Sequence, residues 1–513
     1  MPRLAQQYPT QLPLTLRRRT AVPLQQQIVE QIRQLVLREV LTPGARIPST
    51  RALAEQLDVS RNTVAIAYEL LTAEGLIEVH PARGTSVSRR LPKAFAPAPS
   101  GVASKARAAE RLRPAVPVRM PALALRAPDG ALLYDFRLGQ VDDALFPERS
   151  FRQLFARRLE ATLEPLARYG DPAGLEALRV AIADHLRRAR GIRCSPDRVV
   201  VVAGCQEGLN LIARVLLSPG MDVVVENPCY QGAASVFESH GARLISAPVD
   251  EEGVCVAALS DVRATLAYVT PSHQFPLGFT LSLARRLELL DWASRTGAYV
   301  IEDDYDSDFR YEGSPLLALQ ALDSQSSVIY LGTFSKSIGA GLRLGYAVFP
   351  ESLAAAAVAA KSIMNNGHPM LDQAVVAEFL ASGAFDRHLR RLRHQYLSRR
   401  DCLLRQIERY FGPCRVDGIE GGMHVAWRLP EGAPTARVVQ QLALQQRVGI
   451  YSLEAAPVHA EGSVPASDST VFLGYPCLAP ERIERAMAMV AETVKVGAPH
   501  CPRGATMRCK MDV

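Results

Sequence analysis

Short apolar runs alternate with longer segments of helical spacing over most of the chain after residue 135. Most of these runs are rich in valine, isoleucine and leucine and carry few polar residues. Apolar strands that alternate with helices are typical of a largely parallel sheet covered by helices. The pattern therefore predicts an α/β body, with strands at 199–202, 222–225, 243–247, 265–269, 299–301, 328–331 and 345–349. Further strands at 416, 424–427 and 471–473 predict a smaller C-terminal α+β lobe.

The first ninety residues follow a different pattern. Apolar residues recur at helical spacing between residues 23 and 40, and Ser49 and Ser60 each stand where they can cap the start of a further helix. Two β-like runs, 76–79 and 85–88, follow with a Pro-Ala-Arg-Gly turn between them. Three helices and a β-hairpin predict a winged helix-turn-helix, which is an α+β domain.

A segment rich in proline, alanine and arginine separates the two patterns. At 513 residues the chain is long enough for several domains. We divide it into a flexible arm at 1–20, a winged helix at 21–90, a semi-extended linker at 91–132, a large domain at 133–350, a small domain at 351–495 and a disordered tail at 496–513.

Positive charge is concentrated in the N-terminal quarter of the chain. Residues 1–130 hold 19 Lys and Arg against 9 Asp and Glu, whereas the remainder holds 40 against 43. A basic domain on a near-neutral body indicates a polyanion partner for that domain alone. A solvated basic surface without such a partner is the alternative.

Nine cysteines are scattered through the chain without a Cys-x-x-Cys pair. This spacing favours reduced thiols over disulfides, and it predicts no metal site. The sequence has no apolar run long enough to span a bilayer and no signal-peptide core. We therefore expect a cytoplasmic protein that does not bind a membrane.

A lysine, a carboxylate and an arginine near the predicted strands indicate cofactor chemistry. Lys336 lies in the run Gly-Thr-Phe-Ser-Lys-Ser, Asp303 follows the apolar run 299–301, and Arg343 comes shortly after the lysine. A lysine can form a Schiff base with pyridoxal 5'-phosphate (PLP), a carboxylate can pair with its pyridinium nitrogen, and an arginine can bind its phosphate. The three residues therefore indicate a PLP site, although each motif alone is common on protein surfaces.

The N-terminal pattern also indicates which residues contact DNA. The second helix of a helix-turn-helix leads into the major groove with its first residues, which here are Ser60, Arg61, Asn62 and Thr63. Arg61 can reach a guanine edge or a phosphate. We expect backbone contacts from the start of the preceding helix and from the wing tip, and the residues are Arg46, Ser49, Thr50, Arg51, Arg83 and Gly84.

The run Pro-Ser-Thr-Arg-x-Leu-Ala-x-x-Leu-x-Val-Ser-Arg-Asn-Thr-Val at 48–64 closely resembles the GntR superfamily of bacterial winged-helix repressors. The resemblance implies double-stranded DNA as the partner of this domain. A winged helix used for protein contacts is the alternative.

Several segments of the body resemble fold-type I PLP enzymes, and together they cover about residues 135–490. They are 169–179, 203–208, 226–230 and 270–278, in addition to the lysine and aspartate motifs. With the winged helix, they make the chain similar to the MocR-type regulators, in which a GntR winged helix precedes an aminotransferase-like body. The resemblance implies a head-to-tail homodimer whose body binds PLP and senses a small-molecule effector, with transcription as the output.

The resemblance also implies roles for individual residues. Lys336 would form the Schiff base, Asp303 would partner the pyridine nitrogen, and Tyr305 would bond the ring hydroxyl. The aromatic ring that stacks on the cofactor would be Tyr230. The phosphate would be bound by Gly204, Cys205, Gln206, Thr333 and Arg343, and by Tyr169 from the other protomer.

Four positions depart from the family's pattern. Cys205 replaces a usual Ser or Thr, and Phe275 replaces the Asn of an Asn-Pro-x-Gly loop, so the ring hydroxyl would rely on Tyr305. Gly232 and Glu454 stand where family members that sense an amino acid carry arginines for its carboxylate, and we expect Glu454 to repel an anion. Another arginine, such as Arg310 or Arg428, is the alternative anchor.

These departures bear on the expected function. They argue against a full transamination cycle with an α-amino acid, and they favour PLP itself, an amine or another effector anchored elsewhere. We therefore expect a PLP-dependent transcriptional regulator that uses its aminotransferase-like domain mainly for sensing. A working aminotransferase with an appended DNA-binding domain and a repressor whose body is only a dimerisation scaffold are the alternatives.

Overall fold

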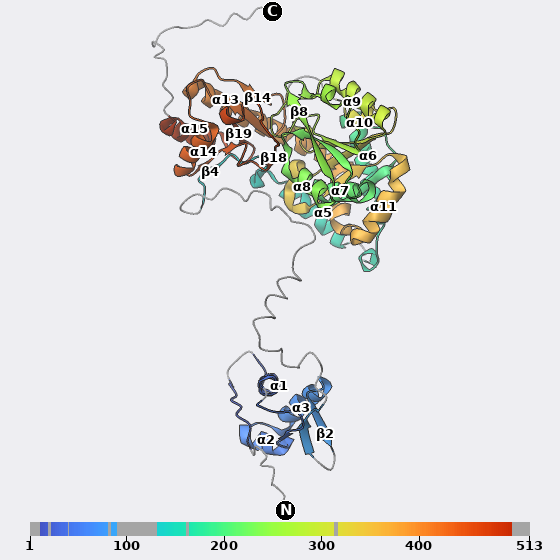
Figure 1. The fold of residues 1–513 in the computed structure, drawn as a ribbon, viewed down its shortest axis with the longest axis vertical. Coiled ribbons are helices and arrows are strands. Elements are labelled where there is room, and N and C mark those ends of the chain that lie inside the picture. Colours follow the sequence, from blue (N-terminus) through green and yellow to red (C-terminus); the bar gives the residue numbers. More distant parts are fainter. Residues whose placement is uncertain are drawn as a thin grey trace, which may run out of the picture. The chain divides into compact units, whose positions relative to one another are not determined.

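The computed structural model describes residues 11–18, 22–38, 40–80, 84–89, 131–160, 164–311 and 317–494. The chain forms two compact units, residues 1–115 and residues 116–513 (Figure 1). Most of the predicted linker and the whole of the predicted tail at 496–513 lie outside the described residues, as do Cys501 and Cys509.

The first unit is a winged helix, as predicted. Its helices are α1 (Leu24–Leu37), α2 (Thr50–Leu57) and α3 (Arg61–Ala73), and its strands β1 (Arg46–Ile47), β2 (Ile77–His80) and β3 (Gly84–Val87) pair in the order β1-β3-β2. Both expected helix caps are present, since Ser49 Oγ accepts a hydrogen bond from the amide of Ala52 and Ser60 Oγ accepts one from the amide of Thr63. The three helices and the sheet enclose one apolar core.

Residues 11–18 pack against the winged helix. Leu12 is 2% exposed and belongs to the apolar core, and the side chain of Gln56 on α2 bonds both its amide and its carbonyl. The amide of Thr15 donates to Gln31 on α1 at 2.9 Å. The prediction of a flexible arm at 1–20 is therefore wrong for residues 11–18, because Leu12 has a buried site and the backbone has partners on two helices.

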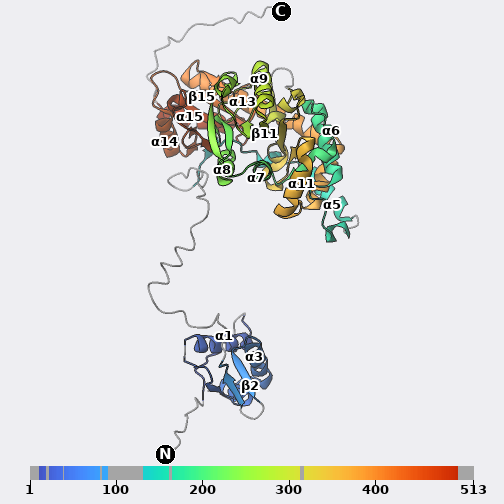
Figure 2. The same cartoon turned by 45° about the vertical axis from the view of Figure 1, so that its right-hand side comes forward.

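An eight-stranded sheet forms the centre of the second unit (Figure 1, Figure 2). Its order is β5-β13-β12-β11-β10-β6-β8-β9. The strands from β12 to β8 are parallel to one another, whereas β13 is antiparallel to β5 and β12, and β9 is antiparallel to β8. This confirms the predicted α/β body. The strands are β5 (Val199–Val202), β6 (Asp222–Asn227), β8 (Arg243–Asp250), β9 (Gly253–Val254), β10 (Leu266–Val269), β11 (Tyr299–Asp304), β12 (Val328–Thr333) and β13 (Gly345–Val348).

Helices cover both faces of this sheet because its strands are apolar on both sides. In β5, Val200 and Val202 pack with α7, α8 and α11, whereas Val199 and Val201 pack with α5, α6 and α12. A third apolar cluster joins α9 to β10 and β11. The helices are α5 (Glu148–Glu160), α6 (Glu176–Arg190), α7 (Cys205–Leu216), α8 (Gln231–Ser239), α9 (Leu283–Thr296), α10 (Leu319–Leu322), α11 (Glu351–Asn365) and α12 (Met370–Ala381).

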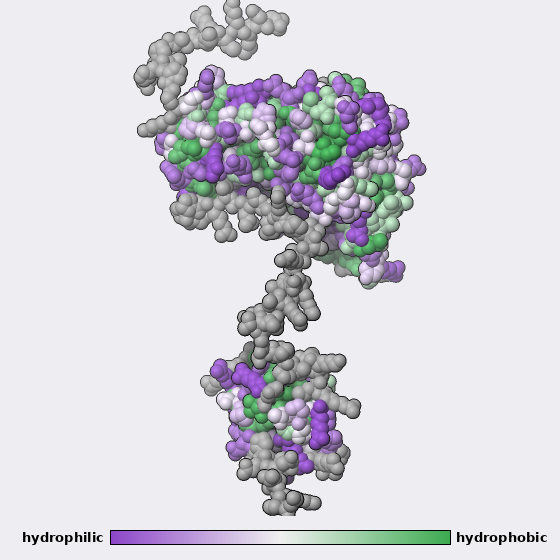
Figure 3. All heavy atoms as spheres, viewed as in Figure 1, coloured by the Kyte–Doolittle hydropathy of each residue, from purple (hydrophilic) through white to green (hydrophobic). Residues whose placement is uncertain are grey.

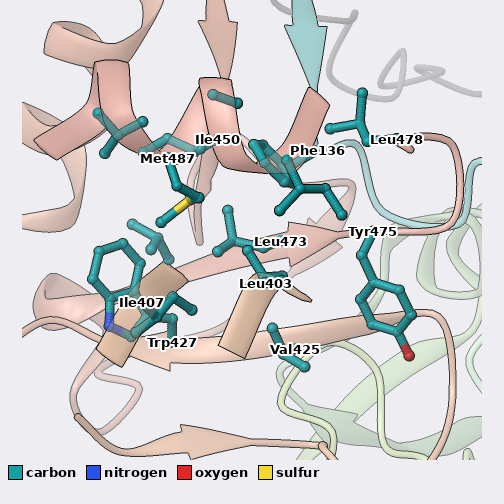
Figure 4. Close-up of a cluster of buried hydrophobic side chains, with 14 of the residues drawn as sticks. Phe136, Leu403, Ile407, Val425, Trp427, Ile450, Leu473, Tyr475, Leu478 and Met487 are labelled. Atoms are coloured by element: carbon teal, nitrogen blue, oxygen red, sulfur yellow. The ribbon is translucent and has the colours of Figure 1, made fainter. Parts of the chain in front are cut away.

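A smaller lobe follows, built on the sheet β14-β15-β19-β17. Figure 4 shows its core, in which Phe136 from the segment before the large sheet lies with Trp427 and Tyr475. The elements are α13 (Ala384–Phe411), β14 (Val416–Asp417), β15 (His424–Arg428), α14 (Ala436–Gln445), β17 (Tyr451–Ser452), β19 (Thr470–Gly474) and α15 (Pro480–Thr493). Two small pairs, β4 (Tyr134–Asp135) with β16 (Val448–Gly449) and β7 (Cys229–Tyr230) with β18 (Val458–His459), tie this lobe to earlier parts of the chain.

The border between the two lobes differs from the predicted one at residue 350. Helices α11 and α12 pack on the large sheet and its helices, and the small-lobe core begins within α13. Conversely, residues 134–136 precede the large sheet in the chain but belong to the small lobe. Sequence periodicity could not show which lobe these segments join, because it predicts helices but not the core in which each helix is buried.

Hydrophilic and hydrophobic residues are interspersed over the drawn face of the body (Figure 3). None of the helices in the described residues combines the length and the apolar character that crossing a bilayer requires. All seven cysteines within the described ranges are free thiols.

Candidate cofactor site and DNA interface

The carboxyl ends of the parallel strands meet at one edge of the sheet, above a cavity of about 320 Å³. Ligands of open α/β sheets bind at such an edge. The cavity is lined by Leu138, Gly139, Cys205, Gln206, Tyr230, Tyr268, Phe275, Asp303, Tyr305, Thr333, Ser335, Lys336, Ala340, Arg343 and Pro457. The fold therefore brings together eight of the ten residues predicted for the cofactor, and Gly204 adjoins them as the residue that caps α7.

Lys336 extends into this cavity from a single π-helical turn, Ser335–Gly339, that begins directly after β12. Such turns are rare and frequently occur at functional sites. The Lys336 Nζ donates a hydrogen bond to the carbonyl of Gly139 at 2.6 Å. Burial lowers the pKa of Lys336, which favours the neutral amine that can act as a nucleophile.

Asp303 lies near the end of β11 and is 3% exposed. The hydroxyl of Tyr268 on β10 donates to its Oδ2 at 2.8 Å, and the Cys205 thiol donates to its Oδ1 at 3.4 Å. Burial raises the pKa of Asp303 to about 6. A carboxylate in this state is ready to accept a proton or a hydrogen bond from a ligand nitrogen.

An anion-binding corner also lines the cavity. It is formed by the N-terminus of α7, where Gly204 has φ +85°, and by Arg343. A Cβ at Gly204 would lie 3.1 Å from Arg343 Nη2, so the glycine allows the guanidinium to approach the helix start. A helix N-terminus beside an arginine suits a phosphate group. Thr333 adds a hydroxyl, 3.0 Å from that of Ser335.

Aromatic side chains form the wall between these groups. The ring of Phe275 lies edge-on to Tyr230 and to Tyr305, with centroids 5.8 and 5.9 Å apart. Gln206 Nε2 donates to the Tyr230 hydroxyl at 3.2 Å, and the Tyr305 hydroxyl donates to the carbonyl of His273 at 3.0 Å. The loop residue Phe275 therefore contributes a ring edge where an asparagine would contribute an amide.

Some predicted residues lie elsewhere. Tyr169 is 88% exposed and does not line the cavity. Glu454 is also exposed, 3.8 Å from Arg437, and belongs to a separate surface hollow. The expectation that Glu454 repels an anion in the cofactor cavity therefore does not fit its position. The alternative anchors Arg310 and Arg428 do not line the cavity either, and Arg428 pairs with Asp417 at 3.1 Å.

The glycine at the other departing position leaves no room for an arginine. A Cβ at Gly232 would lie 2.1 Å from Gln206 Nε2 and 2.5 Å from the ring of Tyr230. Real Cβ atoms do not approach other atoms so closely, so the Tyr230 and Gln206 arrangement and a side chain at 232 exclude each other.

Five lining residues lie outside the sequence motifs and were not predicted, namely Leu138, Gly139, Tyr268, Ala340 and Pro457. Tyr268 is a polar-tipped residue within an otherwise apolar strand, which is a usable signal because a buried hydroxyl needs a partner. Gly139 and Pro457 come from segments far away in the chain, and neither carries a motif.

In the winged helix, Arg61 and Asn62 stand exposed at the start of α3, and Arg51 is exposed on α2. Ser49 and Ser60 are engaged as helix caps, and the Ser60 hydroxyl also contacts that of Thr63 at 2.8 Å. Arg46 lies on β1, paired opposite Ser86, rather than at the start of α2 as predicted. Of the two wing-tip residues, Gly84 begins β3 and Arg83 lies outside the described residues.

The residues of the body fit PLP by their chemistry. The cavity is lined by an amine, a buried carboxylate, an anion-binding corner and a tyrosine ring. These are the partners that an aldehyde, a pyridine nitrogen, a phosphate and an aromatic ring require. A winged helix joined to a PLP-binding body of the aminotransferase type is therefore the class of protein that this fold and site define.

Comparison with known proteins gives the family. Residues 24–87 match the bacterial regulatory proteins of the gntR family, and residues 141–471 match the class I and II aminotransferases. The chain is 35% identical to a probable rhizopine catabolism regulatory protein, MocR, of Rhizobium meliloti, over 81% of this chain and 83% of that protein. It is 33% identical to the pyridoxine biosynthesis transcriptional regulator PdxR of Corynebacterium glutamicum, over 95% and 99%.

Solved structures agree with this assignment. The α-aminoadipate aminotransferase LysN of Thermus thermophilus, complexed with N-(5'-phosphopyridoxyl)-L-leucine, is 32% identical with a TM-score of 0.63, over 71% of this chain and 92% of that one. The multiple substrate aminotransferase of Thermococcus profundus is 29% identical with the same score, over 70% and 91%. The chain belongs to the MocR-type transcriptional regulators, with a GntR-family DNA-binding domain and an aminotransferase-like domain that binds PLP.

Proposed function

We propose that this regulator senses an effector in the PLP cavity and changes the DNA binding of its winged helix in response. The observation that carries the proposal is the meeting of Lys336, Asp303 and Arg343 around one cavity. A domain that served only for dimerisation would have no physical need for this set. The effector must bind one DNA-binding state more tightly than the other, because a ligand with equal affinity for both shifts nothing.

We assign the cofactor contacts as follows. PLP supplies an aldehyde that links to primary amines and a ring that withdraws electrons. Lys336 would hold the aldehyde carbon, Asp303 would pair with the ring nitrogen, and Tyr305 would bond the ring hydroxyl. Tyr230 would stack on the ring. Gly204, Cys205, Gln206, Thr333 and Arg343 would bind the phosphate.

A second copy of the chain completes this site in our proposal. The 88% exposure of Tyr169 supports a contact outside its own subunit, namely the phosphate of the other protomer in a head-to-tail homodimer. Such a dimer presents two winged helices to paired half-sites of double-stranded DNA, led by Arg61 and Asn62. We place this regulator in the cytoplasm.

We further propose that the effector is PLP itself or an amine without a carboxylate. Among the described residues, the cations that line the cavity are Lys336 and Arg343, and the proposed cofactor contacts engage both. The remaining wall includes Leu138, Phe275 and Pro457, which are apolar. A carboxylate placed there would lose its hydration without gaining a charged partner.

The test begins with the visible absorption spectrum of the purified protein with PLP, beside Lys336→Ala and Lys336→Arg. We expect a covalent cofactor band in the wild type alone. Loss in the arginine variant, which keeps the charge, separates covalent chemistry from electrostatics. The absence of a band in the wild type would contradict PLP binding at Lys336.

Phenethylamine and phenylalanine then form a matched pair that differs by one carboxylate. We expect the amine to change both the band and the affinity for DNA fragments selected from a random pool, and the amino acid to change neither. An equal response to both would contradict the proposed effector class. Steady conversion of an amino donor to its carbonyl product would favour a working aminotransferase instead.

A further inference from the structure

Behind Tyr305 lies a buried polar group that the cofactor contacts leave unused. It consists of His273 in the loop after β10, Asp306 just beyond β11, and His424 on β15. The side chains of His273 and Asp306 are 4% and 2% exposed, and His273 Nδ1 lies 3.0 Å from Asp306 Oδ2. The same nitrogen lies 3.2 Å from the hydroxyl of Tyr305.

The directions of these hydrogen bonds follow from the available protons. The Tyr305 hydroxyl has one proton and donates it to the carbonyl of His273 at 3.0 Å. The contact from His273 Nδ1 to that hydroxyl must therefore be donated by the imidazole, whose single Nδ1 proton is shared between the Tyr305 hydroxyl at 3.2 Å and Asp306 Oδ2 at 3.0 Å. A carboxylate also accepts rather than donates, so Asp306 holds the His273 ring with its proton on Nδ1.

The ring of His273 has little freedom to turn away. A Cβ at Gly422 would lie 2.3 Å from its Cε1 and Nδ1, and one at Gly418 would lie 2.9 Å from its Nε2. These two glycines therefore let the backbone pass close against the imidazole. The His424 ring lies 4.7 Å away and is itself held by the carbonyl of Pro276.

The ring next to Tyr305 is that of Phe275, which cannot replace it as a hydrogen-bond donor. Phe275 offers only a ring edge at this point of the cavity, with its centroid 5.9 Å from that of Tyr305. Burial, with Asp306 and Asp303 nearby, raises the pKa of Tyr305 well above its ordinary value. The tyrosine therefore keeps its proton and can donate it to a ligand oxygen.

We propose that His273 and Asp306 are positioning residues that orient the Tyr305 proton toward the ring hydroxyl of PLP. This inference rests on the proposed assignment of Tyr305. With His273 Nδ1–H donating to it, the phenol oxygen has one lone pair occupied, and its own proton remains free to swing from the His273 carbonyl to the cofactor. Without that donor, the hydroxyl can rotate to accept from the ligand or to face away.

A metal ion held by His273, Asp306 and His424 is the rival explanation, since their ligand atoms all lie within 4.8 Å of one another. The bonds of His424 Nε2 to the Pro276 carbonyl and of His273 Nδ1 to Asp306 already use two of these atoms. Arg190 and Arg310 line the small cavity beside His273 and Asp306, and their charges oppose a cation there. The geometry therefore favours the hydrogen-bonded arrangement.

The test compares full-length His273→Leu, His273→Asn, Tyr305→Phe and the double variant His273→Leu/Tyr305→Phe. The asparagine keeps an N–H donor near the position of Nδ1. The readouts are the PLP dissociation constant, the wavelength of the visible band and the pH midpoint of its change, with the melting temperature as a measure of folding. Metal content is measured on each purified protein.

We expect His273→Leu to weaken PLP about tenfold, as the loss of one hydrogen bond does, and to move the band and its midpoint in the same direction as Tyr305→Phe. The double variant should add little to Tyr305→Phe alone, because both changes remove one shared function. His273→Asn should restore the wild-type band.

Other results would overturn the inference. A His273→Leu variant with a lower melting temperature but an unchanged band would reduce His273 to a packing residue. Additive effects in the double variant would show that His273 does not act through Tyr305. A stoichiometric metal that is lost in His273→Leu would establish the rival site. A wild-type protein without a band would overturn the proposed function as well, whereas the first three outcomes leave that function standing.

Discussion

Tyr268 on β10 donates a hydrogen bond to the Oδ2 of Asp303 on the adjacent strand β11, at 2.8 Å. The tyrosine thereby holds the carboxylate from the side of the sheet. Burial nevertheless raises the pKa of Asp303 to about 6, so ionisation of this residue is unfavourable as long as the cavity lacks a cationic partner. The stability of the body and its ability to bind a ring nitrogen are therefore opposed at this residue.

We predict that Asp303→Asn stabilises the cofactor-free protein at pH 7.5. The pKa of Asp303 is higher in the folded than in the unfolded state, so its ionisation destabilises the fold above pH 6, and this penalty vanishes below about pH 4. The gain at pH 7.5 should be at most about 3 kcal/mol, measured by thermal unfolding, and should disappear at pH 4. With PLP the sign should reverse, because the amide cannot stabilise a protonated ring nitrogen. Equal stability of both proteins at both pH values would contradict this account.

Gly204→Ala should weaken PLP binding by at least tenfold. The glycine has φ +85° at the start of α7, and a Cβ there would press on Arg343 at 3.1 Å. Strain of this kind amounts to roughly 1–3 kcal/mol. Gly297→Ala is the matched control, since it has φ +75° and open space around the added Cβ. If a titration finds that both variants lose PLP affinity equally, the N-terminus of α7 beside Arg343 does not bind the phosphate.

Arg61→Ala should weaken binding to a selected DNA site by about 1–3 kcal/mol if the arginine reads a base. Arg61 is exposed at the start of α3. The measurement is an equilibrium DNA titration at fixed salt, with PLP content checked by absorbance. Arg38→Ala, at the exposed end of α1, removes the same charge elsewhere on the domain. If the two variants lose the same affinity, Arg61 contributes only general charge.

Leu12→Ala should destabilise the winged helix by about 2–4 kcal/mol, as the truncation of a buried leucine does. Leu12 is 2% exposed. Leu37→Ala is the control, because Leu37 is 37% exposed. Hydrogen exchange of α1 and α2 in the full chain would report the change separately from the body. Unchanged hydrogen exchange in Leu12→Ala would contradict the packing of residues 11–18 against the winged helix.

Site residues could be predicted from the sequence where a motif lies at the end of a predicted strand. Asp303, Thr333, Lys336 and Arg343 could be predicted because each follows a predicted strand, and the ends of parallel strands meet at one edge. Gly139, His273 and Pro457 could not, since their roles depend on which loops the small lobe brings back to the cavity. The packing of α11 and α12 was also hidden, because an apolar helical face does not specify its partner.

The bond from Lys336 to Gly139 carries a further consequence. Gly139 follows β4, through which the segment after the linker is fixed to the small lobe. A lysine amine has two hydrogens when neutral and three when protonated, but a lysine nitrogen joined to a ligand carbon keeps at most one. A lysine bonded to a ligand therefore has fewer hydrogens to donate to the Gly139 carbonyl than a free lysine has. A ligand bonded to the Lys336 nitrogen therefore weakens the hydrogen bond that this nitrogen donates to Gly139. Gly139 belongs to the chain segment that connects the body to its DNA-binding unit.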